Sequence, residues 1–345
     1  VWIMAYITFQ PSDHFNTKQY TGTGAEHAIT GIGFQPDFVW HKRSDSTSDH
    51  HLYDSIRGAT YKFQVESGAS NQDAQSLKSF DSDGFTLGTN SSSNANSGTF
   101  VSWNWKAAGS NASNSDGSIT SSIRANTTAG FSIVSYTGTG STATVGHGLG
   151  VAPKVILIKG RSNSGAWQYY NEALGNANKC LLNSSGAAIS SGYMNNTSPT
   201  SSVFTVVNDS DVGTSGYTYI AYCFADIKGH SKSGNYNGNS NTNGAFIYCG
   251  FKPKFILIKN RNRNENWTIH DNNMDADYNV NQTKVSPNDT GAKSSNAAFK
   301  MDFLANGFKI RTTDTALNQN GEGYLYLAFA EEPLVSSNNI PATAR

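Results

Sequence analysis

Residues 250–261 read Gly-Phe-Lys-Pro-Lys-Phe-Ile-Leu-Ile-Lys-Asn-Arg, and the predicted fold rests on this pattern. Its apolar run is short and rich in β-branched residues, and it is bounded by Pro253 and Asn260. Such a run favours a buried strand over a helix. Proline is tolerated at a strand entrance because its missing N–H costs no ladder hydrogen bond there. The stretch therefore predicts a strand in the interior of a β-protein.

The same pattern occurs three times, at residues 33–43, 150–161 and 250–261. Each copy has a Gly three residues before a Pro and a Lys six residues after it. A Tyr followed by a Gly turn lies 16 or 17 residues before each Pro, and each copy ends in a stretch rich in aromatic residues. The period of about 100 residues is too long for a solenoid or a propeller blade, and it suits tandem β-sandwiches.

We therefore predict an all-β fold of three tandem β-sandwich domains of related sequence, jelly-roll or lectin-like. Polar, small-residue stretches at 107–117 and 228–234 read as linkers. They place the domains at 1–109, 110–233 and 234–345, the last with a C-terminal tail from residue 334. Helical patterning is scarce, and only residues 73–77 suggest one short turn.

The composition excludes several classes of protein. Lys plus Arg number 25 and Asp plus Glu number 25, so the formal net charge is zero, which argues against an electrostatic grip on nucleic acid or an anionic membrane. Three cysteines offer no disulfide framework and no zinc spacing. We expect no membrane insertion, since apolar runs stay below 18 residues, and no signal peptide, since the apolar N-terminus lacks a basic segment.

Five residues at equivalent places are candidate ligand-binding residues. Asp54, Asn171 and Asp271 stand 18 residues after the Pro of each copy, and Trp167 and Trp267 stand 14 residues after it. The carboxylates and the amide could accept hydrogen bonds from sugar hydroxyls, while the indoles could stack on sugar faces. The alternative is structural, with polar side chains that fix a bend and indoles that lie in a core. Recurrence in all three copies favours the structural role.

Repeated cations follow the predicted buried strand in each copy. Lys42, Lys159 and Lys259 each have an Arg one or two residues further on. We interpret them as solvated charges at strand exits, with a phosphate or sialic-acid clamp as the alternative.

Two clusters resemble metal sites without matching one. Asp81 and Asp83, followed by Gly84, resemble the start of a calcium loop, but the downstream Glu is missing, so we favour a turn. His50-His51 beside Asp49 is read as a polar loop between strands. We predict no metal site and no cofactor.

Known catalytic motifs are absent from the sequence, including GxSxG, HExxH and the phosphate-binding P-loop. Carboxylates such as Glu66, Asp81, Asp83 and Asp302 show no spacing that singles out a catalytic pair. We therefore predict no catalytic residue and expect that the protein is not an enzyme.

Four long motifs suggest a family. They are residues 34–43, 52–58 (Leu-Tyr-Asp-Ser-Ile-Arg-Gly), 79–88 (Ser-Phe-Asp-Ser-Asp-Gly-Phe-Thr-Leu-Gly) and 101–106, together with the C-terminal residues 328–345. This combination resembles a repeated domain of unknown function found in virion structural, tail-fibre-like proteins of marine tailed bacteriophages. The resemblance covers residues 5–345 and brings no catalytic residue with it. The second copy has Ser202-Val203-Phe204 in place of the Asp-Gly-Phe turn, which predicts a different turn there.

The resemblance implies a location at the particle surface. The function that it implies first is a tail-fibre or receptor-binding subunit that engages host surface glycans. The alternatives are a capsid-decorating or head-fibre protein of the same virion and, second, a polysaccharide depolymerase. Expected partners are other virion proteins and a host surface glycan. We also expect a homo-oligomer, with a trimer as one possible form, because assembly would cover exposed sheet edges.

Overall fold

The computed structural model describes residues 7–66, 70–107, 109–275 and 279–333. Within them the chain is all-β, with antiparallel ladders, two four-residue α-helices and three 3-10 turns. This confirms the all-β part of the predicted fold class. The described residues contain no helix of the length and apolarity that a membrane crossing requires.

The first repeat forms two sheets. Its elements are η1 (Pro11–Asp13), β1 (Phe15–Thr21), β2 (His27–Ile29), β3 (Phe38–Arg43), β4 (His51–Asp54), β5 (Tyr61–Gln64), β6 (Ser70–Gln72), β7 (Leu77–Asp81), β8 (Gly84–Leu87), α1 (Ser91–Asn94) and β9 (Thr99–Trp105). The larger sheet has the order β1-β9-β3-β4-β5-β6, and the smaller has the order β2-β8-β7. The turn suggested at 73–77 is present, since the Ser76 N–H donates to the Asp73 carbonyl before β7 begins.

The second repeat follows the same plan with a larger main sheet. Its elements are β10 (Ala112–Asn114), β11 (Ser121–Asn126), β12 (Phe131–Thr137), β13 (Ala143–Gly146), β14 (Val155–Gly160), β15 (Gln168–Asn171), η2 (Glu172–Leu174), β16 (Asn178–Leu181), β17 (Ile189–Ser190), β18 (Val203–Val206) and β19 (Thr218–Phe224). The sheets have the orders β10-β11-β12-β19-β14-β15-β16-β17 and β13-β18. The predicted linker 107–117 is therefore partly wrong, because three of its residues form the edge strand β10.

The third repeat has two principal sheets and a short hairpin. Its elements are β20 (Ser231–Asn237), β21 (Phe246–Tyr248), β22 (Phe251–Asn260), β23 (Thr268–Asp271), β24 (Thr283–Lys284), β25 (Ser294–Ser295), η3 (Ala297–Phe299), β26 (Met301–Leu304), β27 (Gly307–Ile310), α2 (Thr315–Asn318) and β28 (Gly323–Pro333). The sheet orders are β20-β28-β22-β23, β21-β27-β26 and β24-β25. Because β20 begins at Ser231, the boundary predicted at 233/234 lies too late, and the linker predicted at 228–234 already contains the start of a strand. Pro253 lies at a register shift inside β22 rather than at its entrance.

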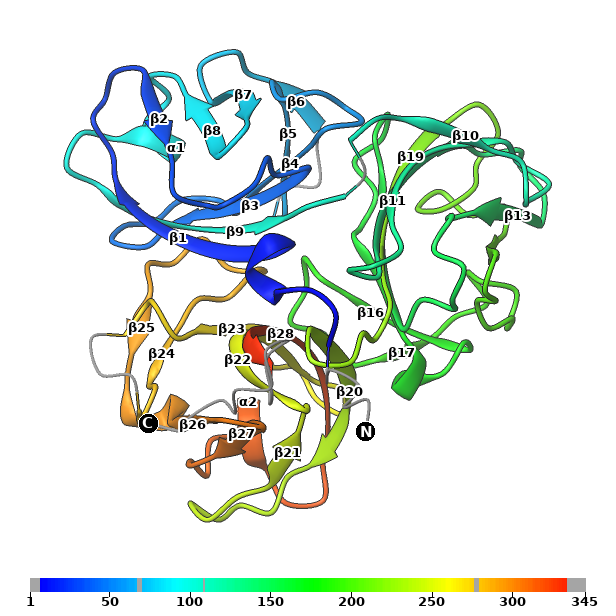
Figure 1. The fold of residues 1–345 in the computed structure, drawn as a ribbon. Helices are drawn as coiled ribbons and strands as arrows, with labels where there is room; N and C mark the ends of the chain where they lie inside the picture. The colour runs from blue at the N-terminus through cyan, green and yellow to red at the C-terminus, as the bar shows by residue number, and fades with distance from the viewer. Residues whose placement is uncertain (1–6, 67–69, 108, 276–278, 334–345) are drawn as a thin grey trace, which may run out of the picture.

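The three repeats surround a common centre. Figure 1 shows three lobes in which the larger sheets face inward and the smaller sheets lie on the outside. Every sheet draws its strands from a single repeat. One apolar cluster nevertheless contains residues of all three larger sheets, whereas three further clusters each belong to one repeat. The repeats are thus joined through a shared core.

The central strands are buried on both faces, which explains their continuous apolar sequences. In β28, Leu325, Leu327 and Phe329 point into the shared core, while Tyr324 and Tyr326 point into the core of the third repeat. The same alternation occurs in the equivalent strands β9 and β19. Each strand therefore stabilises its own repeat with one face and the whole molecule with the other.

Three aromatic residues meet at the centre of the shared core. Trp105, Phe224 and Phe329 occupy the same position in their repeats, five residues after the aromatic residue that opens the last strand's motif. Their ring centroids are 5.5 to 6.2 Å apart. These distances suit edge-to-face aromatic contacts. One large ring from each repeat thus packs at the centre of the molecule.

The repeated Tyr and the Gly two residues after it have a shared structural role. The hydroxyls of Tyr20, Tyr136 and Tyr236 donate to carbonyls of the loop that precedes the last strand, at 2.8 to 2.9 Å. Two residues later a glycine is required, because a Cβ at Gly22 or Gly238 would approach a carbonyl oxygen of that loop to 2.2 Å. The motif therefore ties the strand that carries the Tyr (β1, β12 or β20) to the segment before the last strand of the same repeat.

A truncation in the aromatic centre tests the shared core. We expect Phe329→Ala to lower the free energy of unfolding by about 3–5 kcal/mol, because it removes a buried ring. Calorimetry should show a single transition that moves as a whole to lower temperature. The control Tyr217→Ala, at a tyrosine that is 41% exposed, should change stability by less than about 0.5 kcal/mol. Three separate transitions, of which one moves, would contradict the shared core.

Candidate functional site

The five sequence-predicted ligand residues all lie inside the molecule. The side chains of Asp54, Asn171, Asp271, Trp167 and Trp267 are 0% exposed. Their positions do not let them form a surface sugar site, so the ligand-binding interpretation needs correction. Their burial instead fits the structural role that their recurrence in the repeats favours.

Asp54 joins the first repeat to the second. Its Oδ2 accepts a hydrogen bond from Tyr222 Oη at 2.7 Å and is also bound by Arg57 Nε. Burial raises the pKa of Tyr222 well above its ordinary value, so this phenol is a neutral donor. No sequence pattern indicated that Arg57 would supply the counter-charge to Asp54. A buried carboxylate here is paired and hydrogen-bonded, as such groups must be.

Asp271 makes the equivalent junction between the third repeat and the first. Its Oδ2 accepts from Trp103 Nε1 at 2.7 Å, and its Oδ1 accepts from the Asn273 N–H at 2.7 Å. Trp103 and Tyr222 occupy the same position in their strands. The equivalent residue of the third repeat is Leu327, which has no donor, and Asn171 instead donates to Tyr169 Oη at 3.1 Å within its own repeat.

The two predicted tryptophans also lie at junctions between repeats. Trp167 of the second repeat packs edge-on against Phe63 of the first, with centroids 5.2 Å apart. Trp267 of the third repeat donates through Nε1 to the Leu181 carbonyl of the second at 2.9 Å and packs against Tyr169. Both indoles are therefore core residues that join neighbouring repeats.

The interpretation of the repeated lysines as solvated strand-exit charges is wrong. Lys42, Lys159 and Lys259 are 0% exposed, and burial lowers the pKa of each to about 8. Lys42 Nζ donates to the Thr290 carbonyl of the third repeat at 3.1 Å. Lys259 Nζ donates to the Ser185 carbonyl of the second at 2.7 Å. These ammonium groups satisfy loop carbonyls, so charge at a strand end does not imply exposure.

The two candidate metal clusters have other partners. Asp83 accepts from the N–H groups of Gly31 and Gly33, at 2.9 and 2.7 Å, and these bonds lower the pKa of its carboxyl. This arrangement supports the turn interpretation. His50 and His51 are buried in or beside β4, so the polar-loop interpretation is wrong. In the part of the chain that the structure describes, no three His, Cys, Asp or Glu residues gather where they could hold a metal ion.

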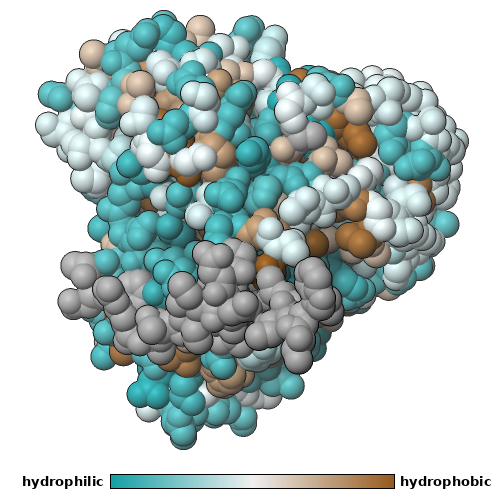
Figure 2. Space-filling model, viewed as in Figure 1, coloured by the Kyte–Doolittle hydropathy of each residue, from teal (hydrophilic) through white to brown (hydrophobic). Residues whose placement is uncertain are grey.

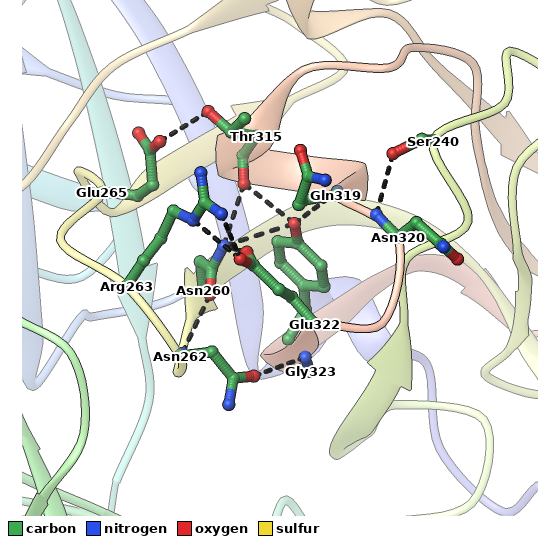
Figure 3. A network of polar contacts seen from close by, with 11 residues as sticks. Ser240, Asn260, Asn262, Arg263, Glu265, Thr315, Gln319, Asn320, Glu322 and Gly323 are labelled. Atoms are coloured by element: carbon green, nitrogen blue, oxygen red, sulfur yellow. Dashed lines mark hydrogen bonds and ion pairs between the residues drawn. The ribbon is translucent and has the colours of Figure 1, made fainter.

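A polar network in the third repeat runs from the buried Asn260 to the partly exposed Arg263 (Figure 3). The Glu322 carboxylate accepts from Asn260 Nδ2 and pairs with Arg263 Nη2, both at 2.6 Å. The Glu265 carboxylate accepts a hydrogen bond from Thr315 Oγ1 in α2. The network thus holds the loop after β22 against α2 and the start of β28, and the Arg263 side chain stays 45% exposed.

An open cavity of about 520 Å³ adjoins this network. It is lined by Thr242, Val280, Ala297, Ala298, Lys300, Arg311, Thr312, Thr313 and Asp314. Asp314 links the two features, because it caps α2 through the Ala316 N–H at 2.9 Å and its pKa is raised by burial and by the nearby Glu265. Hydroxyls, cations and a carboxylate around a small apolar floor can bind a hydroxylated ligand by hydrogen bonds. Sequence reasoning missed this cavity, because its residues are not repeated.

The buried Asp271 predicts a measurable pH dependence. Burial raises its pKa to about 6, whereas an unfolded Asp titrates near 3.8. Because the folded state then binds the proton more tightly, this group stabilises the protein below pH 4, and the contribution is lost as the pH rises to 6. We expect the stability of the wild type relative to Asp271→Asn to fall by up to about 3 kcal/mol across this range. Parallel urea-unfolding profiles from pH 4 to 7 would contradict this assignment.

Comparisons with known proteins identify a family and no characterised relative. No curated protein and no solved structure matches the sequence. The family model described as a domain of unknown function, DUF7483, matches residues 10–333, which include all three repeats. The chain therefore belongs to the DUF7483 family.

Proposed function

We propose that this chain is a structural protein of a bacteriophage particle, a tail-fibre or receptor-binding subunit that engages host surface glycans. Its resemblance to virion proteins supports this proposal. In this view each repeat is a β-sandwich module whose larger and smaller sheets enclose their own core. The shared core would hold the modules rigidly and leave their outer loops free to bind. Figure 2 shows that much of the visible surface is hydrophilic or neutral in hydropathy.

The cavity in the third repeat is the observation that carries the glycan part of the proposal. Its lining includes the exposed Thr242 and Thr313, which carry hydroxyls, and Lys300, Arg311 and Asp314, which carry charged donors and acceptors. A sugar offers hydroxyls in all directions, so it is best bound by such a mixture of donors and acceptors. The adjoining network of Glu322, Asn260 and Arg263 fixes the surrounding loops, which lowers the entropy cost of binding.

The shared core restricts how copies of the chain could assemble. The larger sheets already pack against one another within one chain, so a homo-oligomer must use the outer sheets or the edge strands. The short edge strands β10 and β17 carry exposed residues and are candidate contacts. A trimer or another assembly built in this way would place the loops at the particle surface, beside other virion proteins.

Two measurements test the proposal. Antibody labelling of purified particles should place the protein on the tail, in a few dozen copies or fewer, and its absence from particles would refute the proposal. Hundreds of copies on the shell would instead indicate a capsid-decorating role. The purified chain should bind host envelope polysaccharide, and Lys300→Ala should weaken that binding. The control Lys78→Ala, at an exposed lysine of the first repeat, should leave it unchanged.

A further inference from the structure

The smaller sheet of the third repeat has an unusual outer face. Ile247 of β21 and Phe308 of β27 point into the core, so strand alternation places Phe246, Tyr248 and Lys309 on the outside. Phe246 is 45% and Tyr248 is 56% exposed. Two exposed aromatic rings side by side on one short strand are uncommon for a surface that serves only as a solvated face.

The other two repeats show that the fold does not need these rings. The pair Phe246 and Lys309 corresponds in register to Ala28 and Thr86 in the first repeat. In the second repeat it corresponds to Thr144 and Thr205.

Tyr248 likewise has no aromatic counterpart in the other two repeats. Its counterparts are Thr30 in the first repeat and Gly146 in the second. The inward neighbours, by contrast, remain apolar in all three copies, as Ile247, Ile29 and Val145. Packing therefore fixes the inner face of this sheet, while the outer aromatic residues are specific to the third repeat.

Cations accompany the two rings. Lys309 pairs directly with Phe246 across the strands, and Lys300 and Arg311 lie at one end of the sheet, where they line the cavity described above. Asp302 is the carboxylate on this face, and it contacts Arg311 at 3.4 Å. With Asp314, which lines the same cavity, three cations thus stand against two carboxylates, in a chain whose formal net charge is zero.

The spacing of these groups suits an extended ligand. Phe246 and Tyr248 are two residues apart on a strand, which corresponds to roughly 7 Å. Tyr248 also lines a second cavity, of about 410 Å³, whose wall includes Asp226 and Lys232. Gly307 is the partner of Tyr248 on β27, so the residue directly opposite the ring has no side chain. The binding groups therefore form a row between two cavities.

We propose that this outer face binds an acidic polysaccharide, with Phe246 and Tyr248 stacked on sugar rings and Lys309 and Arg311 paired with acid groups. The inference rests on the proposed glycan-binding function and names its ligand class. The C–H face of a sugar ring packs on an aromatic ring, and its carboxylate forms charge-assisted hydrogen bonds with Lys or Arg. A neutral glycan would leave the excess of cations unused.

Affinity electrophoresis of the full chain tests this proposal with two probes, polygalacturonate and the neutral glycan dextran. The wild type should be retarded by polygalacturonate and not by dextran. The double variant Phe246→Ala and Tyr248→Thr installs the residues of the first repeat, so the fold should tolerate it. It should lose affinity by about tenfold or more, which corresponds to about 1.4 kcal/mol, without a change in melting temperature.

Further variants separate the contributions to binding. Lys309→Thr should weaken binding and reduce its dependence on salt. The matched control Tyr61→Ala, at an exposed tyrosine of the first repeat, should bind like the wild type.

Several outcomes would overturn the proposal. Equal retardation by both probes would refute the acidic class, and no retardation by either would refute the site. Binding of host envelope polysaccharide that survives the double variant would refute this site while leaving the proposed function intact. A wild type that binds neither probe nor envelope polysaccharide would refute both.

Discussion

The central strands are buried on both faces, and this double burial holds the three repeats together. A strand such as β28 contributes one row of side chains to its own repeat and the other to the shared core. A shift of the strand register by one residue would turn each row of side chains toward the wrong core. The two rows together therefore fix the register of the strand. The three repeats therefore behave as parts of one body, with Trp105, Phe224 and Phe329 at its centre.

Polar groups at the junctions give this apolar core its specific arrangement. The carboxylates of Asp54 and Asp271 each accept a hydrogen bond from the neighbouring repeat, and the buried Lys42 and Lys259 each donate to a loop carbonyl of a neighbouring repeat. A buried charge without its partner is costly, so an arrangement that separated these pairs would be disfavoured. Such groups favour one way of packing three similar modules, where apolar surfaces alone would permit several.

The sequence was sufficient to predict the strands and the repeats, because continuous apolar runs and recurring Gly and Pro positions reflect local requirements. It was insufficient for the junctions. Lys42 and Lys259 follow apolar runs in the manner of exposed strand ends, and only the neighbouring repeat buries them. Likewise, nothing local distinguishes a tryptophan that stacks on sugar from Trp267, which donates to Leu181 of another repeat. The cavity of the third repeat was missed for a related reason, since its lining comes from loops far apart in the chain.

Recurrence within the chain therefore marks residues that the shared architecture requires. Residues that recur in all three repeats, such as Tyr20, Tyr136 and Tyr236, maintain the architecture that all three share. A binding site needs to be present only once, so it is expected where one repeat departs from the others while its inner face stays the same. Phe246 and Tyr248 meet this condition, because they replace small residues above an unchanged apolar layer. In a protein built from internal copies, the first and second repeats thus serve as a reference for the third. Residues that all three share are those that the fold requires, and residues found only in the third are candidates for binding.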